Sequence, residues 1–258
     1  MTSLKVTVLG CGTSTGVPLI GCTCVVCTSE DPKNHRLRPG LALEFEGRTV
    51  LVDTPPDLRQ QAIEHRIDRV DAVLYTHAHA DHVLGFDDLR AFTMRHGGEI
   101  PIYGARETLD RLYGWFRYAF DGNATTPGTS RPRLVAREIQ GVFWPVEGLE
   151  VEPIEVWHGP LSVLAFRIGR FAYATDCNYI PDAAIERLRG VDVLILDGLR
   201  YRPHSTHFAI AESIEVAARI GAARTYLTHL SHEVDYTAPA IDMPATVEFA
   251  YDGLVLEL

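Results

Sequence analysis

The segment 76–82 reads Thr-His-Ala-His-Ala-Asp-His and constrains this chain more than any other stretch. It follows a short apolar run, 72–75, which is typical of a buried strand. Where the strand ends, the first two histidines alternate in an extended backbone and can point to the same side. The aspartate and the third histidine come after the turn and can face a second centre. The four candidate metal ligands of this segment are His77, His79, Asp81 and His82.

Further candidate ligands stand in the same context, directly after a predicted strand. They are His158, Asp176 and His229. Imidazole and carboxylate together suit zinc, manganese or iron, and the number of candidates exceeds what one ion binds. A histidine-rich surface loop is the alternative interpretation of the first segment. Several strands that each deliver His or Asp to one edge favour a shared metal site instead.

Asp53 also ends a predicted strand, just before Pro55 and Pro56. An acid at this place can cap the N-terminus of a helix, or it can accept a hydrogen bond from a metal-bound histidine. We expect the second role for Asp53.

Three of the five cysteines crowd into one short segment, at Cys22, Cys24 and Cys27. In a protein of the cytosol, such crowding indicates a metal site more readily than disulfides, because thiols stay reduced there. A group of reactive thiols is the alternative. Cys11 and Cys177 are expected to be small buried residues.

Period-two and helical patterns alternate along the chain and predict an α/β protein. The expected strands are 6–10, 41–46, 48–53, 72–75, 100–104, 134–139, 149–157, 162–168, 171–174, 191–196 and 224–227, followed by a terminal pair, 245–250 and 254–258. The expected helices are 57–66, 107–120, 181–189 and 208–220, with a partly helical stretch at 82–93. We therefore expect one domain, 1–258, with two sheets packed face to face and helices outside. Segment 121–132 has loop composition and either connects two elements or overhangs the site.

The formal net charge of −10 argues against a general surface for nucleic acid, which needs clustered lysine and arginine. No run of 18 apolar residues is present, and no apolar segment follows basic residues at the N-terminus. We expect a cytoplasmic location, no membrane contact and no nucleic-acid partner.

The set of candidate ligands resembles that of the metallo-β-lactamase superfamily in its dinuclear hydrolase form, from the Leu9-Gly10 turn to His229. The resemblance implies an αββα sandwich with the site along one edge of the two sheets. It implies two divalent metals, zinc or manganese, at that site. One metal would be held by His77, His79 and His158, the other by Asp81, His82 and His229, and Asp176 would bridge them.

Two further features resemble the PhnP-type phosphodiesterases of this superfamily. The three cysteines and His232 match a separate zinc site, and such a closed tetrahedral set is structural. His207 matches a histidine that reaches the dinuclear site, and its neighbour His204 could substitute for it. One departure is the segment 53–57, Asp-Thr-Pro-Pro-Asp, where many members of the superfamily carry a glycine.

The resemblance implies a phosphodiesterase in which a hydroxide shared by two metals attacks a small phosphodiester, such as a cyclic ribose phosphate or a cyclic nucleotide. His207 and Asp81 are the expected catalytic residues, and a homodimer is possible. The same metals could instead hydrolyse an ester, a lactone or a thioester. An RNA 3′-processing nuclease is a further alternative, although no basic insertion is visible. A metal-containing sensor or binding module is the alternative without catalysis.

Overall fold

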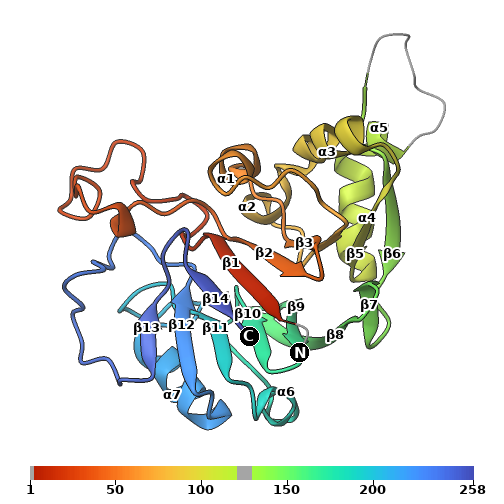
Figure 1. Ribbon diagram of the computed structural model, residues 1–258. Coiled ribbons are helices and arrows are strands. Elements are labelled where there is room, and N and C mark those ends of the chain that lie inside the picture. Colours follow the sequence, from red (N-terminus) through yellow and green to blue (C-terminus); the bar gives the residue numbers. More distant parts are fainter. Residues whose placement is uncertain (1–2, 121–129) are drawn as a thin grey trace.

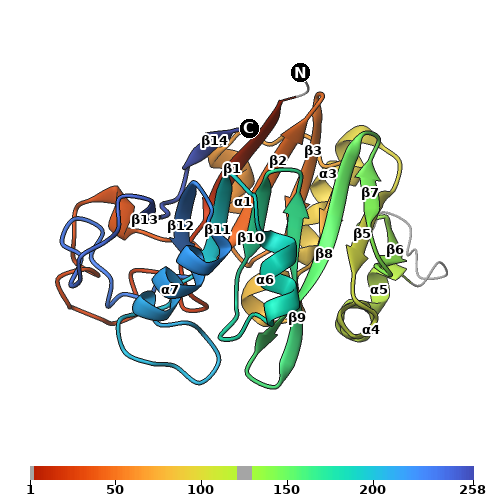
Figure 2. The ribbon, with the colours of Figure 1, turned by 90° about the horizontal axis from the view of Figure 1, so that it is seen from below.

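Two seven-stranded β-sheets lie face to face in the computed structural model, which describes residues 3–120 and 130–258. Figure 2 shows helices on the outer side of each sheet, so the layers are helix, sheet, sheet and helix. The first part of the chain forms most of the first sheet and its helices, and the later part forms the whole of the other sheet and the last strand of the first (Figure 1). The αββα sandwich predicted from the sequence is confirmed.

The first sheet has the strand order β14-β1-β2-β3-β4-β5-β6. Its strands are β1 (Leu4–Gly10), β2 (Gly40–Phe45), β3 (Arg48–Val52), β4 (Ala72–Leu74), β5 (Ile100–Gly104), β6 (Leu134–Glu138) and β14 (Val255–Glu257). Neighbours from β14 to β3 are antiparallel, whereas β3, β4, β5 and β6 are parallel. The parallel set directs its carboxyl ends to one edge of the sandwich.

The second sheet has the order β13-β12-β11-β10-β9-β8-β7. Its strands are β7 (Phe143–Val146), β8 (Leu149–His158), β9 (Leu161–Ile168), β10 (Phe171–Ala174), β11 (Val193–Asp197), β12 (Arg224–Thr228) and β13 (Val247–Phe249). Here β10 to β13 are parallel and β7 to β10 are antiparallel. The two sheets therefore repeat one plan, each with a parallel and an antiparallel part.

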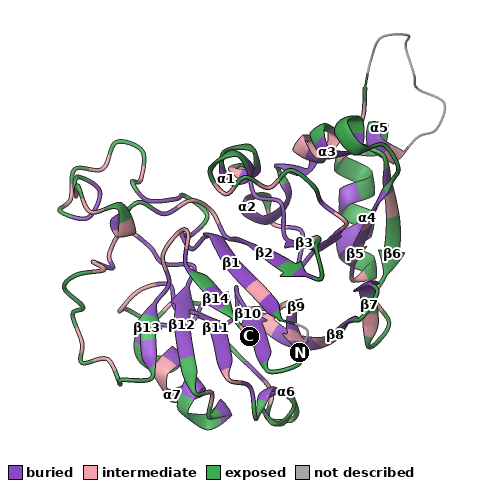
Figure 3. Cartoon of the chain, in the orientation of Figure 1, coloured by how far each residue is buried: buried purple, intermediate pink, exposed green. Residues whose placement is uncertain are grey.

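Short helices connect the strands and cover the sheets. They are α1 (Leu58–Glu64), α2 (Ala80–Val83), α3 (Leu89–His96), α4 (Arg106–Trp115), α5 (Arg117–Phe120), α6 (Asp182–Leu188) and α7 (Ile210–Ile220), with 3₁₀ turns η1 (Pro32–Asn34) and η2 (Phe86–Asp88). The central strands are buried along their length, as expected where helices cover the outer face of a sheet (Figure 3). Among the described residues, no helix combines the length and the apolar character needed to cross a membrane.

The structure corrects the prediction of a terminal strand pair. β13 pairs in parallel with β12 of the second sheet, whereas β14 pairs antiparallel with β1 of the first. The turn between them crosses from one sheet to the other, since Ala250 N–H donates to Leu227 O at 2.8 Å and Gly253 N–H donates to Val8 O at 2.8 Å. A strand pattern shows that a segment is extended and does not show its partner.

Three smaller differences concern element boundaries. The single helix expected at 107–120 is two helices, α4 and α5, because the backbone leaves the helical region at Phe116 (φ −115°, ψ 38°). The ring of Phe116 stacks on Phe86 at 4.4 Å instead. Strand β7 was missed, since a proline interrupts its pattern. Segment 121–132, for which we expected either a connection between two elements or a loop over the site, lies mostly outside the described residues.

Burial between the sheets makes a direct prediction about stability. Ile195 of β11 is 0% exposed in the core between the two sheets, whereas Ile63 of α1 is 60% exposed. We expect Ile195→Ala to lower the free energy of unfolding by about 2–5 kcal/mol, because the change leaves a cavity. The matched change Ile63→Ala should alter it by less than about 0.5 kcal/mol. Urea unfolding followed by circular dichroism measures both, and equal effects would contradict this account of the core.

Candidate metal centre

The candidate ligands lie where strands of both sheets end. The loop 76–79 follows β4 of the first sheet, and Asp176 and His229 follow β10 and β12 of the second. The backbone turns sharply at these ends, with φ of 53° at Asp176, 61° at His229 and 64° at Asp53, which follows β3. Positive φ in a residue other than glycine is strained and is concentrated at functional sites.

The structure brings the seven candidate ligands together in two sets that share one residue. His77, His79, His158 and Asp176 form the first set, and Asp81, His82, Asp176 and His229 form the second. Within each set, one ligand atom of every residue lies within 4.8 Å of the others. This is the division that the superfamily resemblance implies, with Asp176 between the two sets.

Asp176 faces three histidines from separate segments. Its carboxylate oxygens lie 3.1 Å from Nε2 of His82, 3.3 Å from Nε2 of His229 and 3.8 Å from Nε2 of His77. Asp81 lies 3.4 Å from Nε2 of His229 and 3.6 Å from Nε2 of His82. One buried carboxylate is thus the common neighbour of both sets.

These distances fit metal ions better than hydrogen bonds. Within the described residues, Nε2 of His77 and Nε2 of His82 are buried and make no hydrogen bond, which is a costly state for a ring nitrogen. Two ligands that each stand about 2.1 Å from one tetrahedral ion are about 3.4 Å apart. The donor set and its spacing therefore fit two divalent ions.

The opposite ring nitrogens are held by other groups, which fixes the tautomers. Nδ1–H of His82 donates to Asp53 at 2.7 Å, and Nδ1–H of His158 donates to the carbonyl of Thr206 at 2.7 Å. The hydroxyl of Thr76 donates to Asp53 at 2.8 Å and lies 3.0 Å from Nδ1 of His77. Each of these imidazoles is left with Nε2 toward the shared centre, as in known metal sites.

Asp53 has the role that we favoured from the sequence and is no helix cap, because α1 begins after Asp57. The departure at 53–57 from the common glycine leaves the contact between Asp53 and His82 intact. Gly85 makes this loop possible: a Cβ atom there would lie 2.0 Å from the carbonyl oxygen of Pro55.

The histidines of the centre differ in the direction in which their pKa is shifted. Burial lowers the pKa of His77 well below its usual value and also lowers that of His79, so both are neutral ligands. Burial lowers the pKa of His82 as well, but the charges of Asp176, Asp53 and Asp81 outweigh it and raise the value well above normal. A divalent ion in this place would supply the positive charge that these carboxylates otherwise take from a proton.

His207 lies against both sets of ligands. Its ring stands 4.5 Å from the ring of His158 and 4.5 Å from that of His229. Nδ1–H of His207 donates to Asp197 at 2.7 Å, and its Nε2 makes no hydrogen bond within the described part of the chain. Burial would lower the pKa of His207, but the charge and hydrogen bond of Asp197 raise it to about 9.

His204 contacts the ring of His207 at 5.2 Å, and its Nδ1 lies 3.3 Å from the backbone nitrogen of Thr206. It is partly exposed and belongs to neither set. The sequence analysis missed Asp197. The signal was present, because Asp197 ends β11 as the candidate ligands end their strands.

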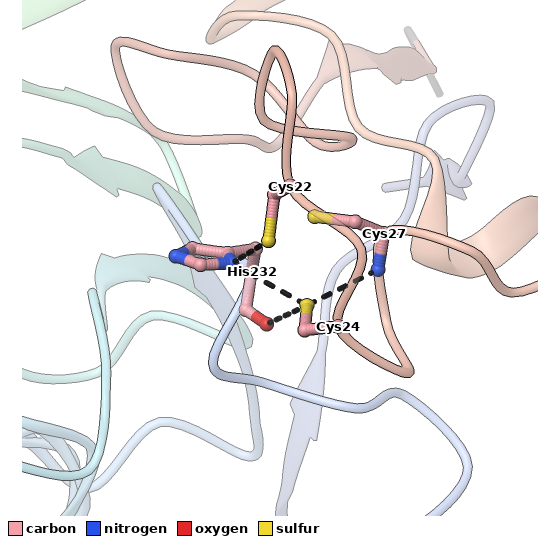
Figure 4. Close-up of side chains that lie close together, drawn as sticks. All are labelled: Cys22, Cys24, Cys27 and His232. Atoms are coloured by element: carbon pink, nitrogen blue, oxygen red, sulfur yellow. Dashed lines mark hydrogen bonds between the residues drawn. The ribbon is translucent and has the colours of Figure 1, made fainter.

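The cysteine segment forms a second, separate cluster with His232. The side chains of Cys22, Cys24, Cys27 and His232 point toward one another (Figure 4), and Nδ1 of His232 lies 3.4 Å and 3.5 Å from the sulfurs of the first two. Sulfur and nitrogen ligands of one tetrahedral zinc stand about 3.6 Å apart. All five cysteines are free, and Cys11 and Cys177 are buried away from the cluster, as expected.

Two cysteines of this cluster differ in the pKa of their thiols. The backbone N–H of Cys27 and His232 lower the pKa of Cys24 to about 6, whereas burial raises that of Cys27 to about 11. Three sulfurs and one imidazole leave no open position, so the set fits a closed zinc site.

Buried Arg36, which follows the cysteine segment in the sequence, binds the chain that leaves β12. Its guanidinium donates to the carbonyls of Ser231 at 3.0 Å and Val234 at 2.8 Å. His229 and His232 lie on that same stretch. The two clusters are therefore linked through one short segment of the chain, although they share no ligand.

Comparison with known proteins agrees with this geometry. Residues 48–230 match the family described as the Beta-lactamase superfamily domain. An octanoyltransferase of Porphyromonas gingivalis is 39% identical over 255 residues, 97% of this chain and 51% of the relative. The chain thus spans about half the length of that relative. Ribonuclease Z of Methanopyrus kandleri is 28% identical, over 88% of this chain and 94% of the relative.

Solved structures extend the comparison to the fold. A crystal structure described as a new diphosphatase from the PhnP family has a TM-score of 0.93 and 39% identity, with 100% of this chain and 98% of that chain covered. Zinc-bound PqqB of Methylobacterium extorquens has a TM-score of 0.76 at 22% identity, over 98% of this chain and 100% of that chain. The chain belongs to the metallo-β-lactamase superfamily of hydrolases and, within it, to the PhnP family.

Proposed function

We propose that this hydrolase is a metal-dependent phosphodiesterase that acts on a small phosphodiester, such as a cyclic ribose phosphate or a cyclic nucleotide. The observation that carries the proposal is the position of His207. Asp197 orients its imidazole at 2.7 Å, and the ring lies against ligands of both metal sets. An acid is thereby held beside the place where the bond would break.

The residues present fit a dinuclear centre. The two sets around Asp176 would hold two divalent ions, zinc or manganese, and the cysteine cluster with His232 would hold one structural zinc. Two bound metals would lower the pKa of a water to about neutral and would stabilise negative charge on the substrate. Asp81, which stands between His82 and His229, would fix the geometry of the second ion.

His207 gives the site a preference for phosphodiesters. The alkoxide that leaves a phosphodiester is a poor leaving group at neutral pH and needs a proton, which Nε2 of His207 can donate. A diester also carries a negative charge before the reaction starts, and a cationic imidazole beside the metals offsets it. A lactone or carboxyl ester is neutral, so it gains less from this charge.

Two relatives support attack at phosphorus. The protein described as a diphosphatase, which shares 39% identity, and ribonuclease Z, which shares 28%, both bear names for cleavage of a bond from phosphorus to oxygen. The net charge of −10 disfavours a long nucleic-acid substrate for this chain. A small diester is consistent with both observations.

Metal content is the first prediction. We expect about three divalent ions per chain, two in the dinuclear centre and one at the cysteines. Asp176→Ala should remove about two of them, because the bridging carboxylate is lost, whereas Cys24→Ser should remove about one. Elemental analysis of the purified variants measures these numbers. A content near one ion in the unaltered protein would overturn the assignment of three sites.

His207 provides a prediction that depends on the leaving group. With an alkyl leaving group, His207→Ala should lower turnover of a diester by about 10²–10⁴-fold, because the proton donor is lost. With bis(p-nitrophenyl) phosphate the loss should be about tenfold or less, since p-nitrophenolate leaves without a proton. His204→Ala is the matched control and should change neither rate by more than about threefold.

The same assay, run on a panel of lactones and esters, tests the reaction class. The unaltered protein loaded with zinc or manganese should hydrolyse the diesters faster than any member of that panel. Turnover of lactones without turnover of diesters would contradict the proposal. Equal losses of turnover for both leaving groups in His207→Ala would contradict it as well.

Asp197 makes a prediction about pH. The pKa of His207 is raised to about 9, so its proton is present below that pH and is lost as pH rises through it. Asp197→Asn removes the charge that raises this pKa, so the alkaline fall in turnover of the alkyl diester should move down by about one unit or more. The profile for bis(p-nitrophenyl) phosphate should keep its alkaline limb. An unchanged profile for the alkyl diester would show that Asp197 has no influence on the acid.

A further inference from the structure

A cavity of about 410 Å³ adjoins the loop that carries the first histidines. Its walls are the start of α4, the hairpin of β8 and β9, and residues 77 and 78 of the metal loop. The hairpin is fixed to that loop, because Leu164 N–H donates to the carbonyl of Thr76 at 3.0 Å. Figure 1 shows α4 beside β5 and β6, two parallel strands of the first sheet. A volume of this size is typical of a site for a small molecule.

The lining combines one flat ring with a few polar groups. Trp157 is partly exposed in the cavity and directly precedes the candidate ligand His158. The other apolar residues of the wall are Ala78, Ala105, Pro160, Leu161 and Leu164. An aromatic face next to apolar side chains suits stacking of a planar ring.

The polar groups carry a small net negative charge. Of the described residues that line the cavity, Arg111 has the only permanent positive charge, while Glu107 and Glu155 have two negative charges. The hydroxyl of Ser162 donates a hydrogen bond to Glu155 at 2.5 Å. Arg111 and Glu107 are exposed, and their side chains form no ion pair or hydrogen bond within the described part of the chain. Carboxylates accept hydrogen bonds from hydroxyl and amino groups, and they repel a phosphoryl group.

We infer that this cavity is the subsite for the uncharged part of the substrate, a nucleoside, whose phosphodiester would lie on the metal centre. The inference rests on the proposed function and adds the substrate class to it. Trp157 would stack on the heterocycle, Glu107 would accept hydrogen bonds from ribose hydroxyls, and Arg111 would donate to acceptor atoms of the base. A second phosphoryl group on the ribose would meet the two carboxylates and bind less well.

Binding of adenosine 5′-monophosphate and of inorganic phosphate to the metal-loaded protein tests the subsite by calorimetry. We expect the nucleotide to bind about tenfold or more tightly than phosphate, because stacking adds to the contact with the metals. Trp157→Ala and Arg111→Ala should each lower this ratio by about threefold or more. Arg106→Ala on the same helix is the matched control, since its guanidinium pairs with Asp110 and Glu138 outside the cavity, and its ratio should stay unchanged.

Binding of adenosine 3′,5′-bisphosphate tests whether the cavity disfavours a second phosphoryl group. It should bind less tightly than the monophosphate, and Glu107→Gln should reduce that difference, because one repelling carboxylate is removed. A nucleotide that binds no better than phosphate, or ratios that are the same in Trp157→Ala, Arg111→Ala and the unaltered protein, would overturn the inference.

Turnover of methyl p-nitrophenyl phosphate separates this inference from the proposed function, since that diester has nothing to place in the cavity. Turnover without nucleotide preference would leave the phosphodiesterase in place and reject the subsite. Nucleotide preference without turnover of any diester would reject the phosphodiesterase and keep the cavity as a nucleotide site.

Discussion

The carboxylate of Asp176 is the contact on which the rest of the site depends. It is buried, and it faces His77 and His82 from the first sheet and His229 from the second, at 3.1–3.8 Å. Burying a charged group is costly unless an opposite charge compensates it. The site therefore joins the two sheets at one edge, and both sheets must be in place before the charge is compensated. Asp176 thus contributes both to the candidate metal site and to the contact between the two sheets.

The second half of the fold contributes more than ligands. β11 places Asp197 beside His207, and the chain after β12 carries first His229 and then His232. The cysteine cluster and buried Arg36 hold that chain from the other side. Leu230 and Val234 of that chain are buried in the core of the second sheet, and a closed metal site would add a further constraint on the exit of β12.

The grouping of the candidate ligands was predictable because their signals are local. Histidines two residues apart after a strand, and single His or Asp residues at later strand ends, can be read without knowing which strands are neighbours. Asp197 carries the same local signal, since it ends β11, but its partner His207 could not be identified, because an irregular loop separates the two residues. The predicted pairing of β13 with β14 was wrong, because a strand pattern shows only that a segment is extended. The turn at Gly253 decides which sheet each strand joins.

Local charge, and not the charge of the whole chain, decides what the site can attract. The formal net charge is −10, yet the centre combines places for divalent ions with a histidine whose pKa is raised to about 9. An anionic phosphodiester, the proposed substrate, would be attracted to this point, while the net negative charge of the chain disfavours a long polyanion, whose further phosphates would lie outside the centre. In the proposed subsite, the two carboxylates of the neighbouring cavity would act in the same direction at shorter range, because they would disfavour a second phosphoryl group. The proposed preference for a small, singly charged diester would thus follow from where the charges lie.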